Sequence, residues 1–348
     1  GEKVAQRVIV RGLEPIDEQT LPDRSFGFRP ARSAHQALQE VRSGSMERGG
    51  RWVLDVDVRK YFASIGHAKL REFLVRRVTD GVVRRLIDKW LKAGVLEDGQ
   101  LFYPDAGTPE GGVVSPILAN VFLYYVLDVW FAEQVQPRLR GPSTLVRYCD
   151  DFVMLLASKA DAERVLAVLG QRLGKYGLQL HPDKTRLVDF RYRGLDHHAS
   201  DESTLATSFS FLGFTHVWGC SQKGKVVVRQ LTAKDRLART LKAFTQQCRG
   251  MRHWPLPDQH RRLTQMLRGH FAYFGISGNY DRLNDLAYQV RRCWRTWLSR
   301  RSDRLNLSWA TFACVAARFP LHPPVIIHPS HWRGRLCTTT ARVHLMST

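Results

Sequence analysis

Residues 144–156 read TLVRYCDDFVMLL, two apolar runs interrupted by a polar stretch that contains the adjacent carboxylates Asp150 and Asp151. Apolar, β-branched runs on both sides of a short polar break are typical of a hairpin, so this stretch predicts a strand, a turn and a strand. Aspartate is also common wherever chains reverse, and taken alone the pair is consistent with an ordinary solvated turn. What lies beside the turn decides between these interpretations.

A second acidic stretch lies at residues 53–59, VLDVDVR. Side chains alternate between the two faces of a strand, so Asp55, Asp57 and Arg59 share one face and the apolar residues share the other. Unpaired carboxylates are costly to desolvate, and two on one face of a half-buried strand indicate a nearby cation. A salt-bridged edge strand that uses Arg59 is the alternative for Asp57 considered alone.

Two further motifs, GTPEGGVVSP (107–116) and FSFLGF (209–214), complete a set of four in one order along the chain. The set resembles the reverse transcriptases, and most closely those encoded by bacterial group II introns. A set of motifs in order is more specific than any one of them. The similarity covers roughly nine-tenths of the chain, and its further segments are EKVAQRVIV (2–10), SFGFRPARSAHQAL (25–38), LRGHFAYFGISGNYDRL (267–283) and FPLHPPVIIHP (319–329).

The resemblance implies an α+β fold, with a right-hand polymerase palm and partial fingers followed by an α-helical thumb or maturase domain. The family's upstream fingers segment, which contacts the triphosphate, is expected to be missing because the similarity opens at EKVAQ. The expected divisions are partial fingers at 1–50, the palm at 51–220, the RNA-binding thumb at 221–330 and an irregular tail at 331–348.

The resemblance also implies the catalytic residues. Asp57, Asp150 and Asp151 match the family's metal-binding carboxylates, and the backbone carbonyl of Val58 is a further ligand. The expected cofactor is Mg²⁺, as two ions, with Mn²⁺ able to replace it. Independently of the family, joining a 3′-hydroxyl to an α-phosphate suits such a site, because one ion activates the attacking oxygen and another stabilises the leaving oxygen.

Phe62 follows Asp57 by five residues and matches the bulky side chain that lies under the sugar of the incoming nucleotide. That match implies a deoxynucleotide substrate, because the side chain rejects a 2′-hydroxyl. Taken singly, such residues are also typical of a core, a turn or a solvated surface, and their joint order favours the site. The remaining matches are Tyr148 and Gly111 for nucleotide binding, Phe211, Leu212 and Gly213 for the primer grip, and Lys184 for protonation of the pyrophosphate.

Three positions depart from the family pattern, one of them Cys149, which replaces a commoner alanine with a small change of volume. Ala63 stands where the family usually has aspartate, and Glu110 stands where it usually has glutamine. A negative charge at residue 110 is expected to weaken binding along a polyanionic path unless it is paired.

Net charge is concentrated near the end of the chain. Residues 221–348 contain 23 Lys+Arg and 5 Asp+Glu, a net charge of +18 out of the total of +21. Such a local excess favours a polyanionic partner, and nucleic acid is the obvious one. The residues expected to bind RNA are Arg261, Arg262, Arg268, Arg291 and Arg292.

Apolar periodicity predicts helices in the same region. The expected segments are residues 232–244, with Thr232 as N-cap, and residues 258–275, 280–301 and 308–319. Trp294 and Trp297 are interpreted as packed core rather than as base-stacking residues, because of their spacing.

Composition points to a cytoplasmic protein. The sequence contains no uninterrupted run of 18 apolar residues and no basic-then-apolar leader, so neither a membrane partner nor secretion is indicated. Its six cysteines have no paired spacing, which suggests a reducing compartment and no zinc site.

The leading hypothesis is an RNA-directed DNA polymerase of group II intron type that also binds intron RNA and assists splicing. Its partners would be an RNA template, intron RNA, a DNA primer or target, and deoxynucleoside triphosphates. The alternatives are an RNA-binding maturase or truncated element without polymerase activity, which the missing fingers favour, and a defence- or CRISPR-associated reverse transcriptase.

Overall fold

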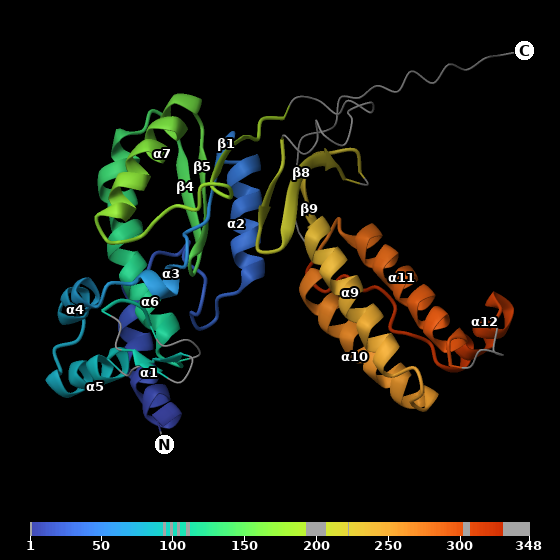
Figure 1. The fold of residues 1–348 in the computed structure, drawn as a ribbon. Helices are drawn as coiled ribbons and strands as arrows, with labels where there is room; N and C mark the ends of the chain where they lie inside the picture. Colours follow the sequence, from blue (N-terminus) through green and yellow to red (C-terminus); the bar gives the residue numbers. More distant parts are fainter. Residues whose placement is uncertain are drawn as a thin grey trace, which may run out of the picture. The chain divides into compact units, whose positions relative to one another are not determined.

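The chain forms two compact units, residues 1–194 with 198–212 and residues 195–197 with 213–348 (Figure 1). They are called the first and the second unit below. The computed structural model describes residues 2–92, 95–97, 100–102, 105–108, 112–192, 207–221, 223–301 and 307–329. Gly111, Glu110 and the predicted tail at 331–348 lie outside these residues.

The first unit is built around an antiparallel sheet with strand order β4-β5-β1-β6. Leu54 in the central strand β1 lies opposite Met154 of β5 on one side and Leu187 of β6 on the other. The strands are β1 (Trp52–Val56), β4 (Ser143–Tyr148), β5 (Asp151–Leu156) and β6 (Arg186–Asp189).

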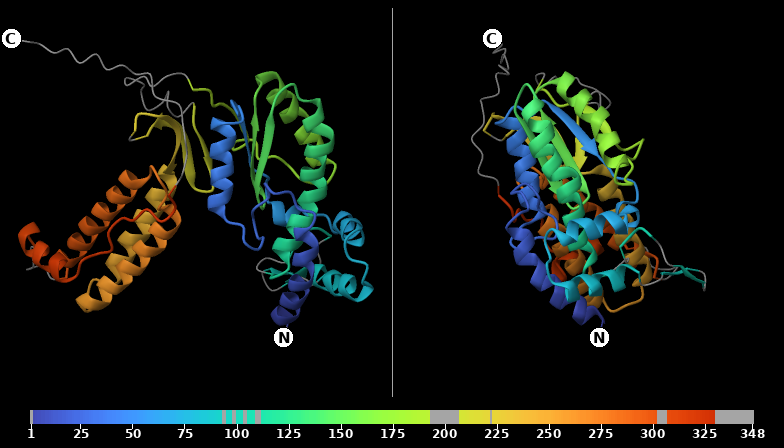
Figure 2. Two further views of the ribbon diagram at one scale, coloured as in Figure 1. Left: turned by 180° about the vertical axis from the view of Figure 1, so that it is seen from behind. Right: turned by 90° about the vertical axis from the view of Figure 1, so that its left-hand side faces the viewer.

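Helices cover both faces of this sheet (Figure 2). Alternate strand residues such as Leu54 and Met154 belong to the main core, which includes the apolar side of α7 (Lys159–Gly174). On the other face, α2 (Ala34–Met46) approaches β5 so closely that a Cβ at Gly44 would collide with Leu155. The predicted alternation of β1 is thereby confirmed, with one set of side chains in the core and the acidic set on the opposite side.

The other elements of the first unit surround this sheet. Two of its helices begin with side-chain caps, a capping box formed by Ser33 and Gln36 and the Asp80 carboxylate at the start of α5, which satisfy free N–H groups. The remaining elements are α1 (Glu2–Glu18), α3 (Tyr61–Ser64), α4 (His67–Val75), α5 (Gly81–Leu91), β2 (Val95–Glu97), β3 (Gln100–Phe102), α6 (Ser115–Leu123) and β7 (Phe209–Phe211).

Helix α6 continues through the π-helical turns η1 (Tyr124–Asp128) and η2 (Phe131–Val135) to the 3₁₀ turn η3 (Gln136–Arg138). The segment Ser115–Arg138 is long and apolar enough to span a membrane by length and composition, and its most apolar 18-residue window has a mean hydropathy of 1.4. However, 72% of its most apolar window is buried inside the protein, as in a core helix.

The second unit begins with a hairpin of β8 (Phe214–Cys220) and β9 (Val226–Thr232), in which Phe214 lies opposite Thr232. Four helices follow in its described part, which confirms the predicted helical C-terminal region. They are α9 (Lys234–Gly250), α10 (Leu256–Phe274), α11 (Tyr280–Ser299) and α12 (Trp309–Arg318).

Trp294 is 1% exposed in the core of this unit, and its indole N–H donates to Gln259 Oε1 at 2.8 Å. The core interpretation of this residue is therefore confirmed, and Trp297 packs half-buried against the same core.

The predicted N-cap at Thr232 is wrong. Thr232 is the last residue of β9, and the helix begins after Ala233. The buried Asn279 engages Thr232 instead, accepting from its backbone N–H at 2.9 Å and donating to its Oγ1 at 2.8 Å. A long-range contact has replaced the local cap.

Candidate active site

The adjacent carboxylates lie at the tip of the β4–β5 hairpin. Tyr148 pairs with Asp151, so Cys149 and Asp150 are the two residues of the turn. Cys149 has a φ of +59°, at a position where glycine is usual in two-residue hairpins. The Cys149 side chain is only 4% exposed, so packing beneath the turn holds this costly backbone conformation.

Asp57 comes directly after β1. Val56 lies opposite Phe152 in the β1–β5 register, and continuing that register by one residue brings Asp57 opposite Asp151. The His181 N–H donates to the Asp57 carbonyl at 2.8 Å, which fixes the backbone just beyond the strand. Strand geometry and this extra bond thus bring carboxylates from distant parts of the chain together.

Val58 forms a single antiparallel bridge with Leu180. The hydrogen bonds of that bridge are made by the flanking residues, Arg59 N–H to the Gln179 carbonyl and His181 N–H to the Asp57 carbonyl. The Val58 carbonyl therefore takes no part in this ladder, as its predicted role as a metal ligand requires.

The carboxylates form an acidic cluster. Burial raises the pKa of Asp151 to about 7 from an ordinary value of 3.8, and the nearby Asp55 and Asp150 add to this rise. The Leu212 N–H donates a hydrogen bond to Asp151 and opposes the rise. Burial likewise raises the pKa of Asp55 to about 6, against the opposing effect of Arg186. Folding has placed negative charge where neighbouring groups do not fully neutralise it.

Two basic side chains approach the cluster. The Lys184 ammonium lies 2.9 Å from Asp57 Oδ2, and Arg186 Nε lies 3.3 Å from Asp55 Oδ2. The sequence singled out Lys184 but not its pairing with Asp57, and it missed Arg186 altogether. One signal was available in the sequence. Lys184 and Arg186 are two residues apart at the start of a strand that pairs with β1, so they lie on the same side of the chain.

A divalent metal fits this donor set. Among the described residues, no three His, Cys, Asp or Glu side chains already converge with metal-binding geometry. Carboxylate oxygens are nevertheless the ligands that Mg²⁺ prefers, and a cation would relieve the repulsion that raises the pKa of Asp151. Binding at Asp57 Oδ2 would require Lys184 to move aside.

The predicted primer-grip residues Phe211 and Leu212 belong to the first unit, and Gly213 belongs to the second. Phe211 is buried, while Leu212 and Gly213 both have positive φ, +51° and +80°, as in a tight reversal of the chain. Through its backbone hydrogen bond to Asp151, Leu212 lies directly at the acidic cluster.

Phe62 is half-buried, and its backbone contacts the first residues of the glycine-containing motif at 107–116. Its carbonyl accepts from the Thr108 N–H at 2.9 Å, and the Gly107 N–H donates to Ile65 at 2.8 Å. Gly107 has a φ of +99°, and a Cβ there would come within 3.3 Å of Ala63. The nucleotide-binding roles of Phe62, Tyr148 and Gly111 stay predictions.

The predicted RNA-binding arginines are all exposed on two helices of the second unit. Arg261 and Arg268 lie seven residues apart on α10, so they face the same side of that helix. The others are Arg262 on α10 and Arg291 and Arg292 on α11.

Comparison with known proteins gives two family matches. Residues 2–216 match the family described as "Reverse transcriptase (RNA-dependent DNA polymerase)". Residues 234–314 match "Group II intron, maturase-specific domain".

Two curated relatives match different shares of the chain. Group II intron-encoded protein LtrA of Lactococcus lactis subsp. cremoris is 26% identical, over 89% of this chain and 63% of its own length. Protein YkfC of Escherichia coli (strain K12) is 31% identical, over 53% of this chain and 57% of its own length. The chain therefore spans less than two thirds of either relative.

Two solved structures show weaker likeness. Telomerase from Candida albicans, in complex with a fragment of telomeric RNA, gives a TM-score of 0.45 at 12% identity, over 90% of this chain and 53% of the other. Apo telomerase from Candida tropicalis gives 0.44 at 11% identity, over 90% and 56%. At these scores the likeness supports no argument about the site.

Proposed function

Because this chain belongs to the reverse transcriptase family, we propose that it is an RNA-directed DNA polymerase of group II intron type. The observation that carries the proposal is the cluster of Asp57, Asp150 and Asp151, which comes together from two strands and a hairpin turn. We assign partial fingers to residues 1–50, the palm to 51–220 and the thumb to 221–330, in a cytoplasmic protein.

Members of this family use divalent metal ions, and we propose two Mg²⁺ ions here, replaceable by Mn²⁺. Asp57, Asp150, Asp151 and the Val58 carbonyl would hold them. Bound there, the ions would activate the primer 3′-hydroxyl and stabilise the leaving pyrophosphate oxygen.

The chain's own residues would position the reactants around this centre. The turn at Phe211, Leu212 and Gly213 would hold the primer end, which the hydrogen bond from Leu212 to Asp151 brings close to the acids. Lys184 already contacts an active-site carboxylate and would reach the departing pyrophosphate after leaving Asp57. Phe62 would lie under the sugar of a deoxynucleoside triphosphate, with Tyr148 and Gly111 nearby.

A maturase function is the second candidate, supported by the match of residues 234–314 and by the exposed arginines of α10 and α11. This domain implies RNA binding, and we propose intron RNA as its partner, with assistance to splicing. The arginines would neutralise phosphates, so affinity should fall steeply as salt rises.

Primer extension tests the polymerase proposal. A DNA primer annealed to an RNA template should be extended with deoxynucleoside triphosphates and Mg²⁺, and not when the metal is chelated. Tight RNA binding without extension would reject the polymerase and leave the maturase function, which splicing of a group II intron RNA would then test.

A further inference from the structure

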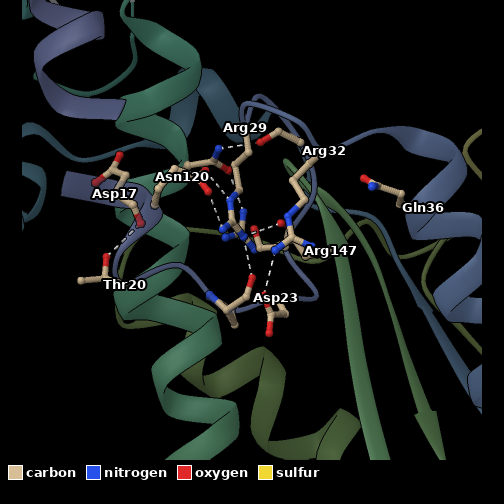
Figure 3. A network of polar contacts seen from close by, with 12 residues as sticks. Asp17, Thr20, Asp23, Arg29, Arg32, Gln36, Asn120 and Arg147 are labelled. Carbon is tan, nitrogen blue, oxygen red and sulfur yellow. Dashed lines mark hydrogen bonds and ion pairs between the residues drawn. The ribbon is translucent and has the colours of Figure 1, made fainter. Parts of the chain in front are cut away.

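A fully buried ion pair lies directly behind the acidic turn. Arg147 of β4 is 0% exposed, and its guanidinium donates to Asp128 through Nε at 3.0 Å and Nη2 at 2.5 Å. Nη1 donates to Asn120 Oδ1 at 2.9 Å and to the Cys149 carbonyl at 3.1 Å. Figure 3 shows Asn120 and Arg147 converging between the α6 helix and the sheet. The hydrogen bond from Arg147 Nη1 to the Cys149 carbonyl reaches the peptide group that joins Cys149 to Asp150.

Stability alone does not account for this arrangement. Two charges removed from water carry a large desolvation cost, and apolar pairs of similar volume are often as stable or more so. Burial lowers the pKa of Arg147, but the Asp128 carboxylate outweighs it and holds the pKa above its ordinary value. A permanent charge is thus kept at a fully buried site.

The same network closes the other side of the turn. Asn120 Nδ2 donates to the Gly27 carbonyl at 2.7 Å. Gly27 lies so close to the turn that a Cβ would come within 2.9 Å of the Tyr148 carbonyl carbon. Arg147 also holds this segment by its backbone, since its carbonyl accepts from the Phe26 N–H at 2.8 Å.

Arg29 anchors the segment in turn. Its guanidinium contacts both Glu18 oxygens, at 2.7 and 3.0 Å, and donates to the Pro22 and Ser25 carbonyls at 2.6 and 2.7 Å. The segment around Gly27, which packs against the turn, is therefore itself fixed to the end of α1.

We propose that Arg147, Asp128 and Asn120 form a buried clamp that fixes the backbone of the acidic turn and so positions Asp150 and Asp151. The inference rests on the proposed polymerase function. These are positioning residues, because they lie behind the turn: Arg147 contacts the Cys149 carbonyl, and Asp128 and Asn120 hold Arg147. The clamp keeps Cys149 at its positive φ, which is costly for a residue other than glycine. Without the clamp the turn would relax to a less costly backbone conformation.

The double variant Arg147→Met/Asp128→Leu tests this clamp. It replaces the ion pair by apolar side chains, so the thermal unfolding midpoint should stay within a few degrees of the wild type. The hydrogen bond to the Cys149 carbonyl is lost. The buried Cys149 thiol should then react with a maleimide about tenfold faster, with the buried Cys248 of the second unit as internal reference.

In primer extension the same variant should lose about a hundredfold in kcat, because a small displacement of catalytic groups is costly, while KM for the nucleotide changes little. Asn120→Ala is the second variant, since it leaves the ion pair intact. It carries the test if the double variant does not fold, and a smaller change in the same direction is expected.

Wild-type alkylation of Cys149 in the folded variants would overturn the clamp. So would an unchanged kcat in an active enzyme. If the wild-type chain extends no primer, the polymerase proposal fails by itself, and the alkylation rates still decide whether the clamp fixes the turn.

Discussion

Replacing Asp151 by asparagine should stabilise the metal-free protein at high pH. Burial, together with Asp55 and Asp150, raises the pKa of Asp151 to about 7. Above that pH the folded protein must hold a carboxylate in a position where the fold disfavours its charge. Asparagine keeps the shape and removes the charge, so Asp151→Asn should unfold less readily than the wild type while losing activity.

The magnitude follows from the pKa. One pKa unit corresponds to about 1.4 kcal/mol, so the rise from 3.8 to about 7 sets an upper limit of about 4 kcal/mol. The cluster is partly open to solvent, and burying an amide costs energy as well, which leaves about 1–3 kcal/mol.

The sign follows from proton linkage. The unfolded chain loses the Asp151 proton near pH 4, whereas the folded protein keeps it up to about pH 7. The group's contribution to wild-type stability is therefore fully present below pH 4 and falls as pH rises towards 7. The advantage of the variant should be near zero at pH 4 and complete above pH 7.

Urea unfolding in EDTA at pH 4.5 and pH 8 measures this difference. Asp23→Asn is the matched control, because the Asp23 side chain is exposed and pairs with Arg32. Adding Mg²⁺ at pH 8 should stabilise the wild type and reduce the gap. A variant less stable than the wild type at pH 8 without metal, or a pH-independent difference, would refute the reasoning.

Two other variants test the nucleotide and RNA contacts. Phe62→Ala should admit ribonucleotides, which would lower the ratio of kcat/KM for deoxynucleoside over ribonucleoside triphosphates. Tyr61→Phe is the control: it loses only a buried 2.6 Å hydrogen bond to the Ala119 carbonyl, and it should keep the ratio. Equal ratios in both variants would remove Phe62 from its role. Replacing three exposed α10 arginines by glutamine should lower the slope of log RNA affinity against log salt by about 2. Lys159→Gln on α7 should leave the slope unchanged. An unchanged slope in the arginine variant would exclude these arginines as phosphate contacts. The three are Arg261, Arg262 and Arg268.

Local patterns predicted the elements that carry the site. Alternation placed Asp55 of β1 and Asp57, directly after it, on one face, and the apolar runs around Asp150 predicted the hairpin. These predictions held because strand periodicity depends only on neighbouring residues. Helical periodicity similarly predicted α10 and α11, although α10 begins two residues earlier than expected.

Contacts between distant residues could not be predicted in the same way. Thr232 has the local features of an N-cap, yet Asn279 takes its hydroxyl. By local sequence Arg147 is an ordinary polar residue of a strand, and its neighbours in sequence do not predict its ion pair with Asp128. Such pairings depend on which helix packs behind the strand, and periodicity does not carry that information.

Primer extension on an RNA template tests the central claim most directly. The wild type and Asp150→Asn are compared with Mg²⁺ present, and their RNA affinities are measured in parallel. The account predicts extension by the wild type, none by the variant, and nearly equal RNA affinity, because the carboxylate acts on metal and not on RNA. Extension by the variant at the wild-type rate, or a large loss of RNA binding, would contradict a catalytic role for the acidic turn.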